Sequence, residues 1–381
     1  MLRSFSHAPL SRRRVLVRVD FNVPIVGQSV GDDFRIRAAL PTIRRLLGRG
    51  NRVILLSHAS DPRQTLKPVA RRLTRILGEP VAFIMNPFGG RKDFFPGGIR
   101  VALVENLRFW RGEESCSRAF ARALARLGDA YVNDAFGAAH RKGASLTILP
   151  RLLPSLIGLL FERELRELDR VLLRPRHPLV AVLGGAKIET KLGILRRFER
   201  VADRVLVGGA VANVLLRARG VSVGRSSGSA EPITREVRRL AQSPKILLPR
   251  DARIRRNRRG RVLIIPLGRL APGDSVLDVG PRTVAEFRRA LAPARTVVWN
   301  GPLGLAEEPA FAIATLAIAR ALSRSRAEVV VGGGDTVAVL DRAGLAGTFR
   351  HVSTGGGAML AYLAGEKLPA LEALKKPKAK N

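Results

Sequence analysis

A glycine-rich run in the middle of the chain carries two lysines at a spacing that suits phosphate binding. The run reads Gly184-Gly185-Ala186-Lys187-Ile188-Glu189-Thr190-Lys191 and follows an apolar stretch. It is expected to open a helix, which would place Lys187 and Lys191 one turn apart on one face. Two ammonium groups, backbone N–H groups and the helix dipole would then converge on a polyphosphate. Two exposed lysines on a solvated helix remain the alternative interpretation.

Two further glycine-rich turns lie near the end of the chain. They read Gly332-Gly333-Gly334-Asp335-Thr336 and Ser353-Thr354-Gly355-Gly356-Gly357, and each follows a short apolar run. Glycine lets backbone amides approach phosphate oxygens, and the Asp335 carboxylate could hold Mg²⁺. One such turn alone is a weak signal, because these turns also serve packing and aspartate is a common N-cap. Three turns together predict a nucleotide-phosphate site, although none is a Walker A motif.

The first half of the chain carries a different polar set, in which arginine predominates. The set comprises Arg18–Pro24, Arg35, His58, Glu105–Arg108 and Asn133–Arg141. Guanidinium forks bind oxyanions, while Asp and Asn bind hydroxyl groups, so the set suits a small phosphorylated or carboxylated anion. Any single arginine is more simply a surface residue in a chain that has 56 of them. Only their shared position after strands favours a binding site.

These residues need elements that hold them at one edge of a sheet. Short β-rich runs alternate with amphipathic stretches along the whole chain, which is typical of βαβ units with a parallel sheet. Ligands of such sheets bind beyond the carboxyl ends of the strands. The predicted strands are Val15–Val19, Val53–Leu56, Val101–Val104, Ala130–Val132, Leu179–Leu183, Arg204–Val207, Ile246–Leu248, Thr296–Trp299, Glu328–Val331 and His351–Val352.

A helix near the middle of the chain marks a domain boundary. Leu165, Leu168 and Leu172 recur at helical spacing between residues 162 and 173, and Pro175 and Pro178 end that helix. We expect hinges at Leu172–Pro178 and Ser353–Gly357. The tail after Leu368 is rich in Ala and Leu and predicts a short helix.

Composition excludes several classes of protein. The chain has 381 residues, 46% of them hydrophobic, which suits a folded protein of two domains. No uncharged apolar run approaches the roughly 18 to 20 residues that span a bilayer, so we expect no membrane partner. Cys116 is the single cysteine, which excludes an intrachain disulfide and fits a reducing compartment, the cytoplasm.

The charge is unusual. Lys and Arg together number 67 against 31 Asp and Glu, a formal net charge of +36. Residues 250–261 alone contain seven Arg around a predicted Asn-Arg-Arg-Gly turn. Nucleic-acid binding is one interpretation of the charge, but the arginines are scattered along the chain. Residues 250–261 could form an RNA-binding hairpin, yet they lack aromatics for base stacking and are predicted to be a solvated loop. The Arg-rich start Met1–Arg14 has the character of a presequence, yet it runs directly into the first strand and is expected to belong to the mature fold.

These motifs, taken in order, resemble phosphoglycerate kinase over essentially the whole chain. Collinear agreement across both halves makes chance an implausible explanation. The segments that carry the resemblance are Val15–Pro24 (VLVRVDFNVP), Arg35–Ile43 (RIRAALPTI), Glu105–Phe109 (ENLRF), Tyr131–Arg141 (YVNDAFGAAHR), Leu183–Lys187 (LGGAK), Trp299–Pro302 (WNGP), Gly332–Thr336 (GGGDT) and Ser353–Ala358 (STGGGA).

The resemblance implies a fold and a division of labour. It implies an α/β protein with two Rossmann-like three-layer αβα domains, whose parallel sheets are joined by a helix and flank a central cleft. Residues 1–165 would form the N-terminal domain, which binds 3-phosphoglycerate, and the tail of about 366–381 would pack back on it. Residues 166–177 would be the linker helix, and 178–365 the C-terminal domain, which binds Mg-ADP or Mg-ATP.

The resemblance also assigns residues. Arg35, Lys187 and Gly334 would act on the transferring phosphoryl group. The acid side would comprise Asp20, Asn22, Arg35, His58, Arg63, Arg108, His140 and Arg141. The nucleotide side would comprise Gly185, Lys191, Gly208, Gly209, Asn300, Pro302, Glu307, Gly333, Gly334, Asp335 and Thr336, with Asp335 also on Mg²⁺ and Glu307 on the ribose.

Some positions depart from the family pattern. Asp61 stands where an Arg is usual, and Arg63 is expected to restore that cation if the loop shifts. Gly143 replaces the second His after the His-Arg pair. Around the adenine, Ala210 and Val276 stand at usual glycines and Ala306 at a common Phe. Weaker binding of the acid and altered base preference are the expected consequences.

We therefore expect a monomeric glycolytic kinase that transfers a phosphoryl group reversibly between 1,3-bisphosphoglycerate and ADP. The alternative is a non-catalytic relative that binds nucleic acid or another polyanion through its Arg-rich surface. For the kinase, nucleic acid would bind only non-specifically, if at all.

Overall fold

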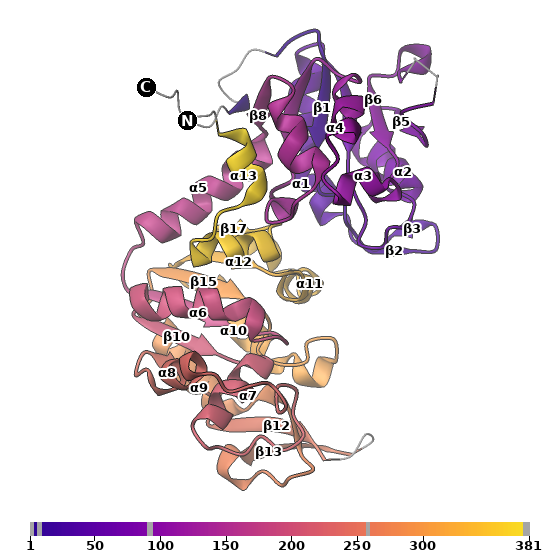
Figure 1. Cartoon of the computed structure of the whole chain (residues 1–381). Coiled ribbons are helices and arrows are strands. Elements are labelled where there is room, and N and C mark those ends of the chain that lie inside the picture. Colours follow the sequence, from indigo (N-terminus) through magenta and orange to yellow (C-terminus); the bar gives the residue numbers. More distant parts are fainter. Residues whose placement is uncertain (1–3, 6–9, 90–93, 257–259, 376–381) are drawn as a thin grey trace. The chain divides into compact units, whose positions relative to one another are not determined.

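The computed structural model describes residues 4–5, 10–89, 94–256 and 260–375. The chain divides into two compact units. The first unit ends at Arg166 and takes up the chain again from Lys367, and the second comprises Glu167–Glu366. Figure 1 shows a sheet with flanking helices in each unit. Among the described residues, no helix is long and apolar enough to cross a membrane.

The first unit is built on a six-stranded parallel sheet. Its strand order is β5-β6-β4-β1-β7-β8. Most of these strands are continuous apolar runs, as expected for a parallel sheet that is covered on both faces. In chain order they are β1 (Arg14–Arg18), β4 (Arg52–Leu56), β5 (Val81–Ile84), β6 (Val101–Val104), β7 (Ala130–Asn133) and β8 (Ser155–Ile157). A short antiparallel hairpin, β2 (Ile25–Val26) with β3 (Ser29–Val30), follows β1.

Helices cover both faces of this sheet, because successive strand residues point to opposite sides. Val15 and Val17 pack with α1 (Phe34–Gly48) and α2 (Lys67–Leu77) in one core. Leu16 packs with α4 (Arg118–Ala125) in another. The shorter elements are α3 (Arg111–Glu114), η2 (Pro96–Gly98), η3 (Leu107–Phe109), η4 (Phe136–Ala138), the π-helical turn η5 (Ala144–Ile148) and η6 (Leu149–Arg151).

The second unit repeats this plan with a second parallel sheet. The strand order is β11-β10-β9-β15-β16-β17. The strands are β9 (Leu179–Leu183), β10 (Arg204–Val207), β11 (Ile246–Leu247), β15 (Thr296–Asn300), β16 (Glu328–Gly332) and β17 (His351–Val352). The helices are α6 (Glu189–Val201), α7 (Gly209–Ala218), α8 (Arg235–Gln242), α9 (Pro281–Leu291), α10 (Ile313–Ser323), α11 (Gly334–Arg342) and α12 (Gly357–Ala364), with the turns η7 (Leu267–Arg269), η8 (Pro309–Phe311) and η9 (Ala346–Thr348).

All ten predicted strands are confirmed: four have the predicted bounds, five differ by one residue at one end, and the first is shifted by one residue at both ends. Two strands of the first sheet, β5 and β8, were not predicted. The described part of the Arg-rich start belongs to the fold, since Phe5 is fully buried and Ser4 bridges Ile157 in parallel.

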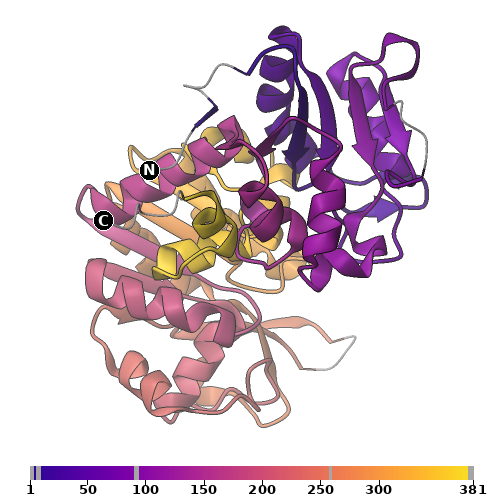
Figure 2. The same cartoon turned by 45° about the horizontal axis from the view of Figure 1, so that its top comes forward.

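An antiparallel sheet in the second unit was missed altogether. It contains β12 (Asp251–Arg255), β13 (Val262–Pro266) and β14 (Ser275–Val279) in the order β13-β12-β14. The segment predicted as a solvated loop thus forms one strand and leads into the next, and the β12–β13 ribbon extends away from the parallel sheet of its unit in Figures 1 and 2. Three residues of the predicted turn, Asn257 to Arg259, lie outside the described residues.

Two helices concern the boundary between the units. The predicted helix at 162–173 is confirmed as α5 (Leu159–Leu173), which begins in the first unit and continues into the second. The Asp134 carboxylate accepts hydrogen bonds from the backbone N–H groups of Leu160 and Phe161 in its first turn. The predicted tail helix is α13 (Pro369–Leu374), and its Ala370 N–H donates to the Ala139 carbonyl at 3.2 Å. Helix α13 therefore packs within the first unit.

Candidate functional site

The first unit gathers basic side chains at the carboxyl edge of its sheet. Asp20 follows β1, His58 follows β4, Arg108 follows β6, and Arg141 follows β7. Parallel strands end at the same edge, so these loops are neighbours. The set named the acid cluster below is Asp20, Asn22, Arg35, His58, Arg108 and Arg141.

Asp20 and Arg35 form the centre of the acid cluster. Arg35 Nη1 lies 3.4 Å from Asp20 Oδ2 and donates a hydrogen bond to the Asn22 carbonyl at 2.9 Å. Burial acts to raise the pKa of Asp20, but Arg35, His58 and Arg18 outweigh it and hold this pKa below its usual value. The carboxylate is therefore ionised and fixes the guanidinium of Arg35.

Asn22 ties the loop after β1 to the loop after β4. Its Nδ2 atom donates to Ser60 Oγ at 2.9 Å, and its Oδ1 atom accepts from the Ser60 N–H at 2.8 Å. Arg108 braces the same loop, because its Nη1 atom donates to the Ala59 and Ser60 carbonyls at 3.2 and 3.0 Å. The two predicted acid-binding residues thus hold a common loop.

His58 is buried and neutral. Burial lowers its pKa to about 3, with further lowering from Arg18, Arg108 and Arg141, whereas Asp20 acts in the opposite direction. Its Nδ1 atom lies 3.2 Å from Arg18 Nη2. The ring can therefore act as a hydrogen-bonding group but not as a cation.

Arg18 is a buried arginine of the predicted polar set that was not among the residues assigned to the acid. Its Nε atom donates to Ser145 Oγ at 2.9 Å, and that hydroxyl donates to Glu113 Oε1 at 2.6 Å. The Arg18 side chain thus connects His58 to a buried carboxylate. The negative charge of Glu113 offsets the positive charge of Arg18, and this pairing allows an arginine to be buried so close to the acid cluster.

Arg141 and Arg108 repel one another. Burial and then Arg108 lower the pKa of Arg141, and Arg35 adds to this effect while Asp20 opposes it. His140 is half-buried, and its Nδ1 atom has no hydrogen-bond partner within the described part of the chain. Arg108 Nε also pairs with Glu114 Oε1 at 3.1 Å. Three guanidinium groups, of Arg35, Arg108 and Arg141, thus stand against the two carboxylates of Asp20 and Glu114, and the remaining positive charge is typical of an anion site.

Arg63 is not part of this arrangement. Its side chain is exposed, and its backbone N–H donates to Asp61 Oδ1 at 2.8 Å. Among the described residues, no hydrogen bond or ion pair joins the Arg63 guanidinium to Asp20 or His58. Arg63 therefore makes no contact with the acid cluster that would let it replace the cation missing at Asp61. Arg63 was predicted to replace the missing cation because it lies two residues after Asp61. Instead, the hydrogen bond between the Asp61 carboxylate and the Arg63 N–H closes a tight turn, and the Arg63 side chain is exposed.

In the second unit, glycines allow three strand-end loops to touch through their backbones. The Gly185 N–H donates to the Pro302 carbonyl at 3.0 Å, and the Gly209 N–H donates to the Leu303 carbonyl at 2.8 Å. Gly209 has φ +62°, and a Cβ there would lie 2.8 Å from the nitrogen of Gly185. Only glycine satisfies both restrictions, so the Gly-Gly pairs after β9 and β10 are needed for this junction.

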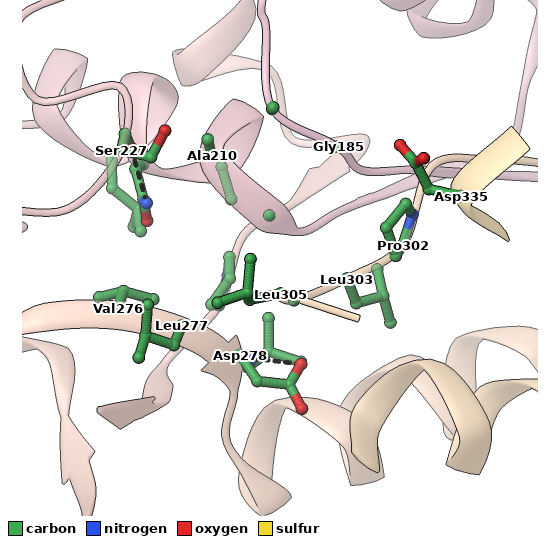
Figure 3. A pocket seen from close by; sticks show the side chains of 18 of the residues that line it. Gly185, Ala210, Ser227, Val276, Leu277, Asp278, Pro302, Leu303, Leu305 and Asp335 are labelled. Atoms are coloured by element: carbon green, nitrogen blue, oxygen red, sulfur yellow. Dashed lines mark hydrogen bonds between the residues drawn. The ribbon is translucent and has the colours of Figure 1, made fainter. Parts of the chain in front are cut away.

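A pocket opens beside the junction, within the second unit (Figure 3). Five of the predicted nucleotide residues line it, namely Gly185, Gly209, Pro302, Glu307 and Asp335. Figure 3 shows Asp335 and Pro302 at one end of the pocket, and Ser227 and Val276 at the other. The far end is mainly apolar, which suits a base.

A buried lysine lies behind Gly185, next to the end of the pocket that Asp335 lines. Lys191 is 7% exposed, and its ammonium group donates a hydrogen bond to Asn300 Oδ1. Burial lowers the pKa of Lys191 to about 8, although Asp335 acts to raise it. Asn300 Nδ2 is buried without a partner in the described part of the chain, and neither Asn300 nor Lys191 lines the pocket itself.

Asp335 and Thr336 take different positions in the turn after β16. Asp335 is exposed at the first turn of α11 and lines the pocket. Thr336 is fully buried, and its hydroxyl accepts from the Gly301 N–H at 2.9 Å. Thr336 therefore supports the loop after β15 and does not line the pocket, and its binding to the nucleotide stays a prediction. Gly333 has φ +98°, and Gly334 is exposed in the first turn of α11, where its amide is available.

The predicted pairing of Lys187 with Lys191 on one helical face is wrong. The Ile188 carbonyl is the first to accept helical hydrogen bonds, from the N–H groups of Lys191 and Leu192, and α6 begins at Glu189. Lys187 therefore precedes the helix and is exposed, while Lys191 is buried. Their different environments predict different roles.

The positions that depart from the family pattern differ in their consequences. Ala210 and Val276 line the apolar end of the pocket. Ala306 does not, and packs with Ala312 and Val339. At Gly143 a Cβ would lie 2.8 Å from Glu113 Oε1, so any side chain there would have to displace the carboxylate that binds Ser145.

The described residues fit a magnesium ion only together with a ligand. They contain no group of three or more His, Cys, Asp or Glu side chains that could hold a metal. Mg²⁺ typically binds one or two carboxylates and completes its shell with phosphate oxygens and water. The exposed carboxylate of Asp335, opposite Lys191, meets that requirement.

Comparison with known proteins agrees with this geometry. The family model described as phosphoglycerate kinase matches residues 5–366. A phosphoglycerate kinase of Rubrobacter xylanophilus is 46% identical, with 98% of each chain covered, and one of Thermomicrobium roseum is 43% identical over 98% of this chain and 99% of its own.

Solved structures agree as well. A phosphoglycerate kinase structure from Coxiella burnetii has a TM-score of 0.84 at 35% identity, over 98% of this chain and 99% of its own. One from Pyrococcus horikoshii has a TM-score of 0.88 at 34% identity, over 98% of each chain. The predicted fold of two α/β domains with parallel sheets is thereby confirmed. The chain belongs to the phosphoglycerate kinase family.

Proposed function

We propose that this protein transfers a phosphoryl group reversibly from 1,3-bisphosphoglycerate to Mg-ADP, which gives 3-phosphoglycerate and ATP. A kinase that acts on a carboxyl group is what membership of the family indicates. One observation carries the proposal further: the chain presents two different anion sites, each at the carboxyl edge of its own parallel sheet. One is rich in guanidinium groups, and the other combines a buried lysine, a carboxylate and an apolar pocket.

The acid cluster would bind 3-phosphoglycerate. Arg108 and Arg141 provide charge for the phosphate, and Asp20 and Asn22 provide acceptors and donors for the hydroxyl and carboxyl groups. His58 is neutral and would donate or accept a single hydrogen bond. We assign His140 to the same ligand, because its buried Nδ1 atom lacks a partner among the described residues.

The nucleotide would occupy the pocket of the second unit. Its base would lie at the apolar end and its phosphates at the end that Asp335 lines, with Lys191 close behind Gly185. Gly208, Gly209 and Pro302 belong to the backbone junction beside the phosphates, and Glu307 would meet the ribose. Asp335 would hold Mg²⁺ with phosphate oxygens, and the metal would neutralise phosphate charge.

Transfer itself requires alignment and charge neutralisation. The accepting carboxylate is already ionised, so no general base is needed. Arg35 and Lys187 would stabilise the equatorial oxygens of the phosphoryl group in flight, and the Gly334 amide at the start of α11 would add a hydrogen bond. Lys187 suits this role because it is exposed and unconstrained by the helix.

We assign the first unit to the acid and the second to the nucleotide, so residues 1–165 and 178–365 would be the two ligand-binding domains. Transfer would then need the two ligands to meet, with hinges at Leu172–Pro178 and Ser353–Gly357. A monomer in the cytoplasm fits one cysteine and a glycolytic kinase. The non-catalytic, polyanion-binding alternative has no support from the relatives, which are named as kinases.

The direct experiment measures ATP formation by the purified protein from 1,3-bisphosphoglycerate and Mg-ADP. The proposal expects turnover that depends on both substrates and on Mg²⁺. The absence of ATP, combined with nucleic-acid affinity that falls steeply with salt, would instead establish the alternative.

A further inference from the structure

Asn213 carries a buried polar atom at the wall of the nucleotide pocket. The residue lies in α7, is 2% exposed and lines the pocket. Its Oδ1 atom has no hydrogen-bond partner within the described part of the chain. Because a buried acceptor left unpaired loses its hydrogen bonds to water without replacement, an unpaired oxygen beside an open pocket indicates a ligand that supplies a donor.

The orientation of this amide is fixed by Ser227. The Nδ2 atom of Asn213 donates to the Ser227 carbonyl at 3.0 Å. A carbonyl oxygen can only accept, so a rotated amide would set two acceptors against each other. The group that Asn213 keeps for a ligand is therefore an acceptor, not a donor.

Asn213 belongs to the end of the pocket that would hold the base. Its partner Ser227 lies at the end opposite Asp335 in Figure 3, beside Val276. Asp335 faces the buried ammonium of Lys191 at the phosphate end. An acceptor near Ser227 would thus meet the base and not the phosphates.

The other buried polar group of this pocket is already satisfied. Asp278 Oδ1 accepts from the Val279 N–H at 2.9 Å, and Oδ2 accepts from the Ala314 N–H at 3.0 Å. Burial raises the pKa of Asp278 to about 7, and its oxygens serve to hold β14 to the start of α10. The lining around Asn213 is otherwise apolar, with Leu216, Val276 and Leu277.

We infer that Asn213 Oδ1 accepts a hydrogen bond from the exocyclic amino group of the base, and that Asn213 thereby selects a 6-aminopurine nucleotide against a 6-oxopurine nucleotide. A 6-oxo group has no hydrogen to donate, so its oxygen and Asn213 Oδ1 would be two acceptors that face each other without a hydrogen bond. A site with a buried polar group strongly rejects an analogue that leaves that group unpaired. The inference rests on the proposed function, which supplies the nucleotide.

The test compares the binding of ADP and inosine diphosphate by titration calorimetry, with Mg²⁺, to the full-length protein and to Asn213→Leu. We expect the unmodified protein to bind ADP about 3- to 10-fold more tightly than inosine diphosphate, as one hydrogen bond provides. In Asn213→Leu this ratio should fall to about 1, because ADP loses affinity. Ser227→Ala is the matched control, since it keeps the carbonyl that orients Asn213 and should keep the ratio.

A second measurement does not depend on any variant. N6,N6-dimethyl-ADP has no N–H at the 6-position, and the unmodified protein should bind it as weakly as inosine diphosphate. Equal affinity for ADP and inosine diphosphate, or a ratio unchanged by Asn213→Leu, would overturn the assignment while ATP formation continued. A protein that binds no nucleotide and forms no ATP would instead overturn the proposed function, and the role of Asn213 with it.

Discussion

Arg35 Nη1 lies 3.4 Å from the Oδ2 atom of Asp20, a carboxylate that is itself 8% exposed. The guanidinium is thus positioned by a buried anion from another loop and by the Asn22 carbonyl. A cation held in advance stabilises developing charge without reorganisation, which is the condition for effective electrostatic catalysis.

Arg35→Ala should therefore lower kcat by about 10²–10³-fold, as expected for the loss of one preorganised group at the transferring phosphoryl. Arg37→Ala is the control on the same helix, because Arg37 is exposed and pairs only with Asp33. Steady-state kinetics of both variants, with circular dichroism to verify folding, make the comparison. Equal kcat values for the two variants would remove Arg35 from the mechanism.

Lys187→Ala should reduce kcat by about 10²-fold or more while the fold and the affinity for ADP are nearly unchanged. The reason is that Lys187 is exposed before α6 and does not line the pocket. Arg196→Ala, on the exposed side of α6, controls for the loss of one positive charge. Unaltered turnover in Lys187→Ala would contradict its assignment to the phosphoryl group.

ADP binding should weaken as the pH rises through about 8, the pKa to which burial lowers Lys191. Below that pH the side chain is an ammonium, and above it the side chain is neutral, so affinity should fall by up to about tenfold per pH unit. Calorimetry across this range measures the slope. Lys191→Gln should bind ADP weakly with a flat profile, and a slope that survived in Lys191→Gln would assign the titration to another group.

The free energy of unfolding should decrease in acid because of His58. Its pKa is about 3 in the folded protein and about 6.5 when unfolded, so the unfolded chain binds the extra proton between these values. Stability is then complete above about pH 6.5 and is lost by up to about 1.4 kcal/mol per pH unit below it. Urea unfolding of the protein and of His58→Gln measures this contribution. An identical pH dependence in the variant would show that His58 does not titrate on unfolding.

Gly209→Ala should be much more damaging than Gly220→Ala. Both glycines have positive φ, but a Cβ on Gly220 meets nothing within 4 Å, whereas one on Gly209 would collide with the Gly185 backbone. Gly220→Ala should cost about 1 kcal/mol of backbone strain, and Gly209→Ala about 1–3 kcal/mol more. Only Gly209→Ala should also weaken ADP binding. Thermal unfolding with and without ADP separates the loss of stability from the loss of ADP binding. Equal losses of stability in the two variants would show that the Gly209 and Gly185 backbones do not approach closely.

Most of the parallel sheets could be predicted, because buried parallel strands are apolar runs that punctuate the chain. The antiparallel sheet could not. β12 alternates Asp-Ala-Arg-Ile-Arg, and its charged face is stabilised by residues far along the chain: Arg255 pairs with Glu308 and lies 4.8 Å above the Phe311 ring. Tertiary contacts of this kind override local propensity.

The sequence predicted most of the residue types at the two candidate sites, but it predicted less well which side chains are buried and where they point. Arg18 could have been identified as buried, because it shares strand parity with Leu16, which faces a core. Asn213 gave no signal, since its significance depends on the Ser227 carbonyl. The environments of Lys187 and Lys191 depend on where α6 begins, and helix boundaries are weakly encoded in local sequence.

The return of α13 to the first unit affects how the protein is made. Because α13 bonds Ala139, next to His140, the loop that carries His140 and Arg141 is supported by a helix that is translated only after the whole second unit. The second unit, which is continuous in sequence, can finish folding while translation still runs. We expect newly synthesised molecules to bind nucleotide before they bind acid.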